Sequence, residues 1–318
     1  MNLSTTIFFL APLSNFESED LDLGNGFKIE NMRLDLAADR ISVLEGISKE
    51  DAYKKLIIEY SCVQGSSGLA DKQTATFICK SFEIDQEIND THGDEWQKLI
   101  DPAMQKHFEY TKSLKDIIDK MRLFKEGAIR TPVYHSFFMN GSKINSLGTA
   151  YGIVPGGYKE GHLMEKYVLT HDEIAELNTF FSTIELPFSQ PYIDLCFNNF
   201  SLSYNIDNNA LSFLSLMMSL EVLFNQGKTD ISYTIARCSA ALLSKDKTEF
   251  SSNFKAMKAF YNKRSKCVHE GKVRDITSED VLQLRGYVRR AIIKAGKINK
   301  SKKDLIDLLN SVGFEILQ

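Results

Sequence analysis

The stretch from Asn209 to Asn225 reads NALSFLSLMMSLEVLFN and is apolar on nearly every side of a helix. A helix of this kind is normally the central helix of a bundle, because a surface helix keeps polar residues along one side. One acidic residue, Glu221, interrupts the run. We therefore expect this part of the chain to fold as a helical bundle built around 209–225.

The sequence on both sides of this stretch predicts further helices. A Thr or Ser followed three residues later by an acid is typical of a first helical turn, because the two side chains satisfy its free amide groups. Gly just after a helical pattern is typical of a helix end. The start signals are Thr170–Glu173, Thr277–Asp280 and Ser301–Asp304, the stop signals are Gly227 and Gly271, and the predicted helices cover 170–181, 231–243, 250–269, 277–295 and 302–312.

The N-terminal part of the chain has a different character. Short runs rich in Ile, Phe, Thr and Tyr, separated by Gly-containing turns, predict strands at Thr6–Leu13, Phe27–Met32, Lys55–Val63 and Thr74–Ile84. A helical period follows over 94–125, with Pro102 placed to break it near its start, and sequence rich in Gly and Pro continues to about residue 165. The expected fold class is α+β: a strand-containing region over 1–165, then an all-helical domain over 166–318.

Composition and apolar runs indicate the cellular compartment of the protein. The five cysteines are scattered and form no CxxC pair, which favours free thiols over a disulfide framework or a structural zinc site. No Lys or Arg precedes the apolar run 6–13, so we interpret this run as a strand and not as a secretory leader. No apolar stretch approaches membrane-spanning length. We expect a soluble, cytoplasmic protein with no membrane partner.

Charge is distributed unevenly along the chain. The segment from Phe254 to Lys303 holds fifteen Lys/Arg and four Asp/Glu, a net charge of +11, which leaves -15 for the rest of a chain whose total is -4. A basic segment in an acidic protein favours a polyanionic ligand such as RNA. Solvated helix faces without any ligand are the alternative explanation.

The segment Tyr261-Asn262-Lys263-Arg264-Ser265-Lys266-Cys267-Val268-His269-Glu270-Gly271 contains the chemistry-bearing pattern. Metal-free RNA cleavage needs a group that moves protons near neutral pH, which suits histidine. It also needs a fixed cation for the charged phosphorane, which suits the planar arginine fork. The spacing alone has little specificity, and a second Arg-x(4)-His pattern occurs at Arg130–His135, where Pro132 denies it a helical frame.

The order of elements over about 212–272 resembles the HEPN superfamily, and within it the Apea-like branch. The resemblance rests on the apolar helix with an embedded acid (216–224), a short loop into 231–237, and a third helix that ends in the Arg264–His269 motif. It covers about the last 110 to 150 residues, and the N-terminal half is not assigned to a family. Many HEPN proteins are metal-independent ribonucleases in which two Arg-x(4–6)-His motifs meet in a dimer.

The resemblance implies specific roles for residues of this chain. Arg264 and His269 match the catalytic pair, and cleavage would leave 2′,3′-cyclic phosphate ends without a cofactor or metal. Ser265 departs from the Asn, Asp or His that is commoner after the arginine, and serine is a poor proton carrier. Gly271 stands where one toxin subclass has a tyrosine. Supporting roles in RNA binding would fall to Asn262, Lys263, Ser265, Lys266 and Lys272.

Geometry adds the expectation of a homodimer. Residues five apart on a helix are turned by about 140° about its axis, so one copy presents Arg264 and His269 poorly to a single phosphate. Two copies related by a two-fold axis can surround it. The N-terminal region would then act as a sensor of a ligand or partner, as in a stress or phage-defence response.

Structural roles compete with these functional ones. Arg264 is the expected partner of Glu221, because an acid in so apolar a helix needs one. His269 can serve as a helix-end cation, and Cys267 as a small buried hydrophobe. The remaining histidines are too scattered to propose a metal site; they are His92, His107, His135, His162 and His171. The Pro155–Gly157 turn with Lys159 is predicted to be a hairpin turn. A non-catalytic module that binds RNA or a nucleotide and a purely structural dimer remain the alternative functions.

Overall fold

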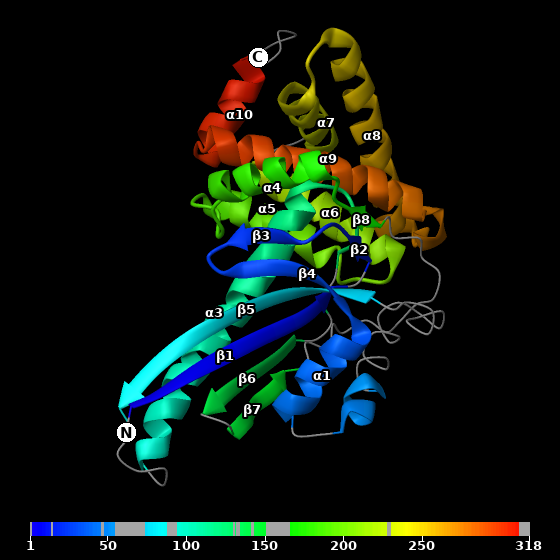
Figure 1. Ribbon diagram of the computed structural model, residues 1–318. Helices are drawn as coiled ribbons and strands as arrows, with labels where there is room; N and C mark the ends of the chain where they lie inside the picture. The colour runs from blue at the N-terminus through cyan, green and yellow to red at the C-terminus, as the bar shows by residue number, and fades with distance from the viewer. Residues whose placement is uncertain are drawn as a thin grey trace. The chain divides into compact units, whose positions relative to one another are not determined.

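The computed structural model describes residues 2–13, 15–45, 48–54, 74–87, 94–129, 131, 134–140, 143–150, 166–227 and 230–311. They form two compact units, unit 1 over Met1–Ile184 and unit 2 over Glu185–Gln318 (Figure 1). The predicted strand 55–63, the turn 155–157 with Lys159, and the residues Arg130, His92 and His162 lie outside the described residues.

Unit 1 is built on an antiparallel sheet, which confirms the strand-containing character predicted for the N-terminal part. The strand order is β3-β4-β5-β1-β6-β7, and β1 pairs along its whole length with β5, from Asn2 opposite Glu87 to Leu13 opposite Thr76. The short strands β2 and β8 form a separate parallel pair. Strand bounds are β1 Asn2–Leu13, β2 Phe16–Glu17, β3 Leu21–Gly24, β4 Phe27–Arg33, β5 Thr74–Glu87, β6 Tyr134–Asn140, β7 Lys143–Ala150 and β8 Tyr167–Val168.

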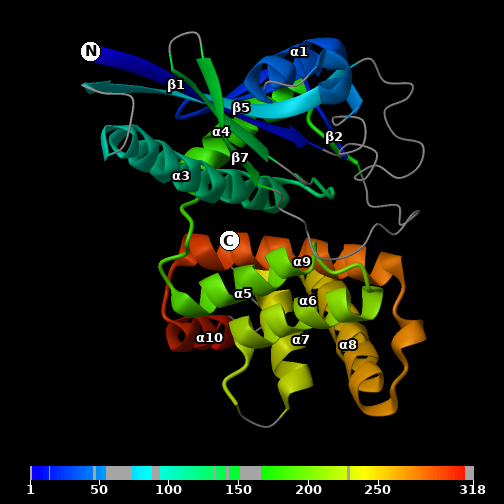
Figure 2. The same cartoon turned by 90° about the horizontal axis from the view of Figure 1, so that it is seen from below.

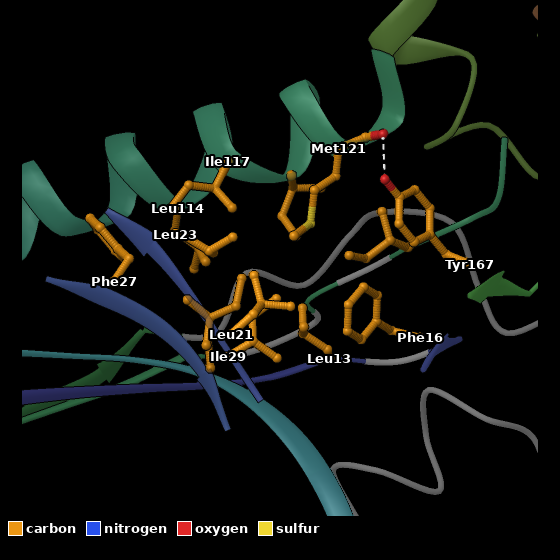
Figure 3. Packing of buried hydrophobic residues seen from close by; sticks show 14 of the residues in the cluster. Leu13, Phe16, Leu21, Leu23, Phe27, Ile29, Leu114, Ile117, Met121 and Tyr167 are labelled. Atoms are coloured by element: carbon orange, nitrogen blue, oxygen red, sulfur yellow. Dashed lines mark hydrogen bonds between the residues drawn. The ribbon is translucent and has the colours of Figure 1, made fainter. Parts of the chain in front are cut away.

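Successive residues of β1 are apolar and buried, and their side chains point alternately to the two faces of the sheet: Phe9, Ala11 and Leu13 to one face and Leu10 to the other. On one face, the side chains of β1, β3 and β4 pack with the helix α3 (Asp94–Phe124), whose buried residues Tyr110, Leu114, Ile117 and Met121 keep the helical period. Figure 3 shows this cluster, in which the hydroxyl of Tyr167 donates to the carbonyl of Met121 at 2.9 Å. On the other face, a smaller cluster includes residues of α1 (Leu34–Glu45), as the two sides of the sheet in Figure 2 show.

Two expectations for unit 1 are corrected. Helix α3 continues through Pro102 without a break, because the lost amide hydrogen bond is a local cost to a helix anchored by its buried face. The helix α4 (His171–Thr183) belongs to unit 1, so the units divide after Ile184 and not at the expected boundary after residue 165. Leu177 of α4 lies in the α3-side core, and Glu173 accepts hydrogen bonds from Lys125 at 2.6 and 2.7 Å.

Unit 2 consists of helices in its described part. They are α5 Pro191–Leu202, α6 Asn209–Phe224, α7 Ile231–Leu243, α8 Lys247–Glu270, a 3-10 turn over Val273–Asp275, α9 Ser278–Ile298 and α10 Lys302–Ser311. The capping box at Thr277 is present with both of its hydrogen bonds, as is the one at Thr170 in unit 1. Helix α6 ends at Asn225, which is its C-terminal cap, and the predicted stop signal Gly227 lies just beyond this cap.

The apolar helix α6 lies at the centre of this unit, as its sequence predicts. It packs against α5, α7, α8, α9 and α10. Three serines at helical spacing make its contact with α5: Ser212, Ser215 and Ser219 donate to the carbonyls of Ser203, Asn199 and Cys196 at 2.9, 2.8 and 3.0 Å. Serine is small and satisfies its hydroxyl locally, so the two helices approach closely without an unpaired buried group.

The last helix is held by an arginine of α7. The guanidinium of Arg237 donates to the carbonyls of Leu309 and Asn310 and to the side chain of Asn310, at 2.9, 3.1 and 2.8 Å. The final carbonyls of a helix have no partner within the helix and carry partial negative charge, so a cation there is stabilising. Arg237 therefore fastens the carboxyl end of α10 to α7.

We expect Arg237→Ala to loosen α10 while the rest of unit 2 keeps its structure. Loss of the cap should destabilise α10 by about 1 kcal/mol or more, because charged hydrogen bonds to carbonyls are lost. Hydrogen exchange of the α10 amides, followed by mass spectrometry, should become several-fold faster. Arg237→Lys keeps the charge but has one donor group instead of a fork, so its α10 exchange rate should lie between those of wild type and Arg237→Ala. Unchanged exchange in Arg237→Ala would show that α10 is held by its apolar contacts alone.

Candidate nucleic-acid interface

The Arg264–His269 motif lies in the last turns of α8. Asp246 caps the start of this helix by accepting a hydrogen bond from the amide of Glu249 at 2.8 Å. Gly271 ends it with a left-handed φ of 66°, a conformation that costs glycine little. The helix is continuous between these caps, so the chain presents the motif residues at fixed positions around a regular helix.

Arg264 is turned toward the central helix. Its Nε lies 3.1 Å from Oε1 of Glu221, and the two side chains are 24% and 22% exposed. Oε1 is buried and makes no aligned hydrogen bond, so the contact is an ion pair held by charge. This confirms the expected partnership of Glu221 with Arg264. The guanidinium also lies 5.8 Å from the ring centre of Tyr261, and in the described part of the chain its two terminal nitrogens donate to no acceptor.

His269 is exposed in the last turn of α8. Because α8 is regular through both residues, Arg264 and His269 are turned by about 140° from one another, as expected from their spacing. One copy of the chain therefore does not bring the two side chains to a common point. Cys267, between them, is buried, which confirms its interpretation as a small core residue.

Two of the lysines assigned to RNA binding are engaged within unit 2. Lys263 donates to both carboxylate oxygens of Asp280 at 2.6 and 2.7 Å, which ties α8 to the capping box of α9. Lys272 forms an ion pair with Glu270 at 2.6 Å, and this pair lowers the pKa of the Glu270 carboxyl. Asn262 and Lys266 are exposed, while Ser265 is partly buried. Of the proposed supporting residues, Asn262 and Lys266 are the ones most open to a ligand.

The pair of Lys263 and Asp280 predicts a specific weakness in acid. Burial alone would raise the pKa of Asp280, but hydrogen bonds from Lys263 and Thr277 outweigh it and lower that pKa below its usual value. A carboxyl with a lowered pKa stabilises the fold above its unfolded-state pKa, and this contribution disappears as pH falls through the folded-state pKa. The stability difference between wild type and Asp280→Asn should therefore be present near pH 6 and shrink below about pH 4. Denaturant midpoints measured across this range test it, and a difference independent of pH would contradict it.

Other cations of the basic segment also have internal roles. Arg285 is buried and donates to the carbonyl and hydroxyl of Ser203 and to the hydroxyl of Ser212, at 3.0, 3.2 and 3.2 Å. Lys294 donates to the carbonyl of Leu242 at 3.0 Å, and burial lowers its pKa. The excess of positive charge in the sequence is thus partly used inside unit 2, and the charge that faces solvent is concentrated on fewer residues.

Sequence reasoning missed the part of the basic segment that remains open. Lys255 is exposed and Lys258 partly so, and both lie on the same side of α8 as Lys266 and His269. The signal was present in the sequence, because no acidic residue occurs between Glu249 and Glu270.

The described residues contain no group of three or more His, Cys, Asp or Glu side chains placed to hold a metal ion. None of the helices within the described ranges is long and apolar enough to cross a membrane. Among the other histidines, His107 is buried, which lowers its pKa, and His171 lies 3.1 Å from Glu19 on the surface of unit 1. Comparison of the chain with protein-family models, with curated proteins and with solved structures finds no match.

Proposed function

We propose that this protein is a metal-independent endoribonuclease that cuts single-stranded or loop RNA as a homodimer, with the carboxyl end of α8 as its active site. The observation that carries this proposal is the state of Arg264. Glu221 faces its Nε, while both terminal nitrogens keep their donors available, and the side chain is partly open to solvent. A cation oriented in this way suits a phosphorane, whose oxygens accept two parallel hydrogen bonds.

The reaction assigns a role to each of the two motif residues. The 2′-oxygen of a ribose attacks the adjacent phosphorus, the bond from phosphorus to the 5′-oxygen breaks, and a 2′,3′-cyclic phosphate forms. One proton leaves the 2′-hydroxyl and one is delivered to the departing 5′-oxygen. His269 moves protons as general acid/base, Arg264 stabilises the charge, and a second copy supplies the other motif of the two-fold site.

A non-catalytic RNA-binding module is the second candidate, and one observation favours it. Arg264 and His269 face different sides of α8, and Ser265, a poor proton carrier, is partly buried between them. Binding through the exposed cations of α8 needs none of these groups to meet. For unit 1 we propose a sensor role toward a regulatory ligand or protein, as in stress or phage defence, by analogy at the level of the fold alone.

Incubation of the full-length protein with end-labelled single-stranded RNA in EDTA separates these functions. We expect shortened products whose 3′ ends carry cyclic phosphate, identified by mass spectrometry. RNA that is bound but uncut would favour the binding module. RNA that is neither bound nor cut would favour a structural role for unit 2.

A further inference from the structure

The solvent side of α8 combines two features of a surface for single-stranded nucleic acid. At 100° per residue, its open polar side chains lie within about 80° of one another around the helix axis. They are Lys255, Lys258, Asn262, Lys266 and His269. We call this set the basic face. The buried side chains Asn253, Met257, Phe260 and Cys267 lie on the opposite side, so the basic face points away from the core.

The acids of α8, Glu249 and Glu270, lie near its two ends, and Glu270 interacts electrostatically with Lys266 and His269. Between Glu249 and Glu270 the sequence contains no Asp or Glu. The two cations of this stretch that do have acidic partners, Lys263 and Arg264, lie outside the basic face and contact Asp280 and Glu221. Within the described part of the chain, Lys255, Lys258 and Lys266 form no ion pair. Their charge is therefore available to an external anion.

An aromatic row runs beside the basic face on the α7 side. Phe254 is stacked on Phe250, with ring centres 6.4 Å apart and planes at 9°, and Tyr233 of α7 meets the Phe254 ring edge-on at 5.8 Å. Tyr233 is 51% exposed although it is a large side chain. Figures 1 and 2 show α7 running next to α8, and the row lies beside the end of the basic face that carries Lys255 and Lys258.

We infer that the basic face and Tyr233 bind single-stranded RNA, with the phosphates along Lys255, Lys258 and Lys266 and a base stacked on Tyr233. A groove or ridge that combines cations for the backbone with an exposed aromatic ring is the usual design for binding single strands, because every base offers a flat face to stack. The distance from Lys255 to His269 along the helix axis is about 21 Å. A strand bound at Lys255 and Lys258 would therefore run along the surface of α8 toward the proposed catalytic end at His269. The inference rests on the proposed function only for what happens at that end.

The test uses single-stranded RNA whose 2′-hydroxyls are methylated, because such RNA is bound but has no nucleophile for cleavage. Fluorescence anisotropy at several salt concentrations gives Kd and its salt dependence. Lys255→Glu/Lys258→Glu should raise Kd at least tenfold and reduce the slope of log Kd against log salt by about 1.4, since each phosphate contact contributes about 0.7 for a single strand. Tyr233→Ser should raise Kd about fivefold or more and leave the slope unchanged, because stacking releases no counterion.

Matched controls distinguish these effects from a general loss of charge or of folding. Lys297→Glu/Lys300→Glu makes the same charge change at exposed positions of unit 2 outside the basic face and should leave Kd within about twofold. Tyr233→Phe keeps the ring and should bind like wild type. Equal weakening by both double variants, unchanged binding of Tyr233→Ser, or tighter binding of duplex than of single strands would overturn the inference.

The same variants separate this inference from the proposed function. If the wild type binds the methylated strand through these residues but does not cut unmodified RNA, the basic face stands and the endoribonuclease proposal fails. If unmodified RNA is cut equally well by wild type and Lys255→Glu/Lys258→Glu at subsaturating substrate, the proposed function stands and the basic face is refuted.

Discussion

His269→Ala should reduce the rate of RNA cleavage by about 10² to 10⁴, because a positioned group that moves protons contributes about this much to a reaction. The affinity for methylated single-stranded RNA should change little, since alanine removes one imidazole from a face that keeps its three lysines. Single-turnover cleavage with enzyme in excess measures the rate, and anisotropy measures the affinity. Loss of cleavage without loss of binding is the pattern that a catalytic His269 requires.

Further variants make this result specific. His171→Ala removes another exposed histidine, in unit 1, and should leave cleavage unchanged. Arg264→Lys keeps the charge near Glu221 but loses the fork, so its rate should lie well below wild type. Equal rates in wild type and His269→Ala would remove His269 from the mechanism.

Arg285→Ala should cause the largest loss of stability in unit 2, about 4 kcal/mol. The variant removes hydrogen bonds from a charged donor to Ser203 and Ser212 and the stacking of the guanidinium on Tyr204, 4.2 Å away. It also leaves a cavity, because Arg285 is only 5% exposed. Arg285 joins α9 to the end of α5 and the start of α6. Its loss should therefore weaken the packing of α6, the helix that carries Glu221.

Hydrogen exchange measures this effect in one unit at a time. Peptides from α3 report unit 1, and peptides from α5, α6 and α9 report unit 2. In Arg285→Ala we expect exchange in the α5, α6 and α9 peptides at lower urea than in wild type, with unchanged exchange in the α3 peptides. Arg274→Ala, at an exposed position of the 3-10 turn, is the control, and equal effects of the two variants would contradict the prediction.

Helices whose ends carry local signals were predicted well. The hydrogen bonds of a capping box join residues only three apart, so the start of α9 at Thr277 can be recognised without knowing the rest of the fold. Helix α1 was missed because it lacks such signals, since its first residue directly follows strand β4. Helix α5 has no side-chain cap at Gln190, but Pro191 stands at its first position. Its buried residues Ile193, Cys196, Phe197 and Phe200 keep the helical period, so this helix could have been predicted.

One contact of the candidate site could also be predicted from the sequence alone. The partnership of Arg264 with Glu221 follows from the cost of an unpaired acid in an apolar helix, a rule that needs only the sequence. The partnership of Lys263 with Asp280 does not follow from any local rule, because it depends on where α9 begins relative to α8. Burial of Arg285 was equally hidden, since its acceptors lie far away in the sequence.

The sequence by itself determined the α+β fold class, the central place of α6, the helix ends marked by capping residues and Gly271, and the spacing of Arg264 and His269. These depend on interactions between near neighbours and on the period of apolar residues. Only the tertiary structure decided that α4 joins unit 1, which cations of the basic segment are buried or paired, and that Tyr233 of α7 meets Phe254 of α8. Those outcomes depend on contacts between distant segments, whose partners are fixed by packing and not by the local sequence.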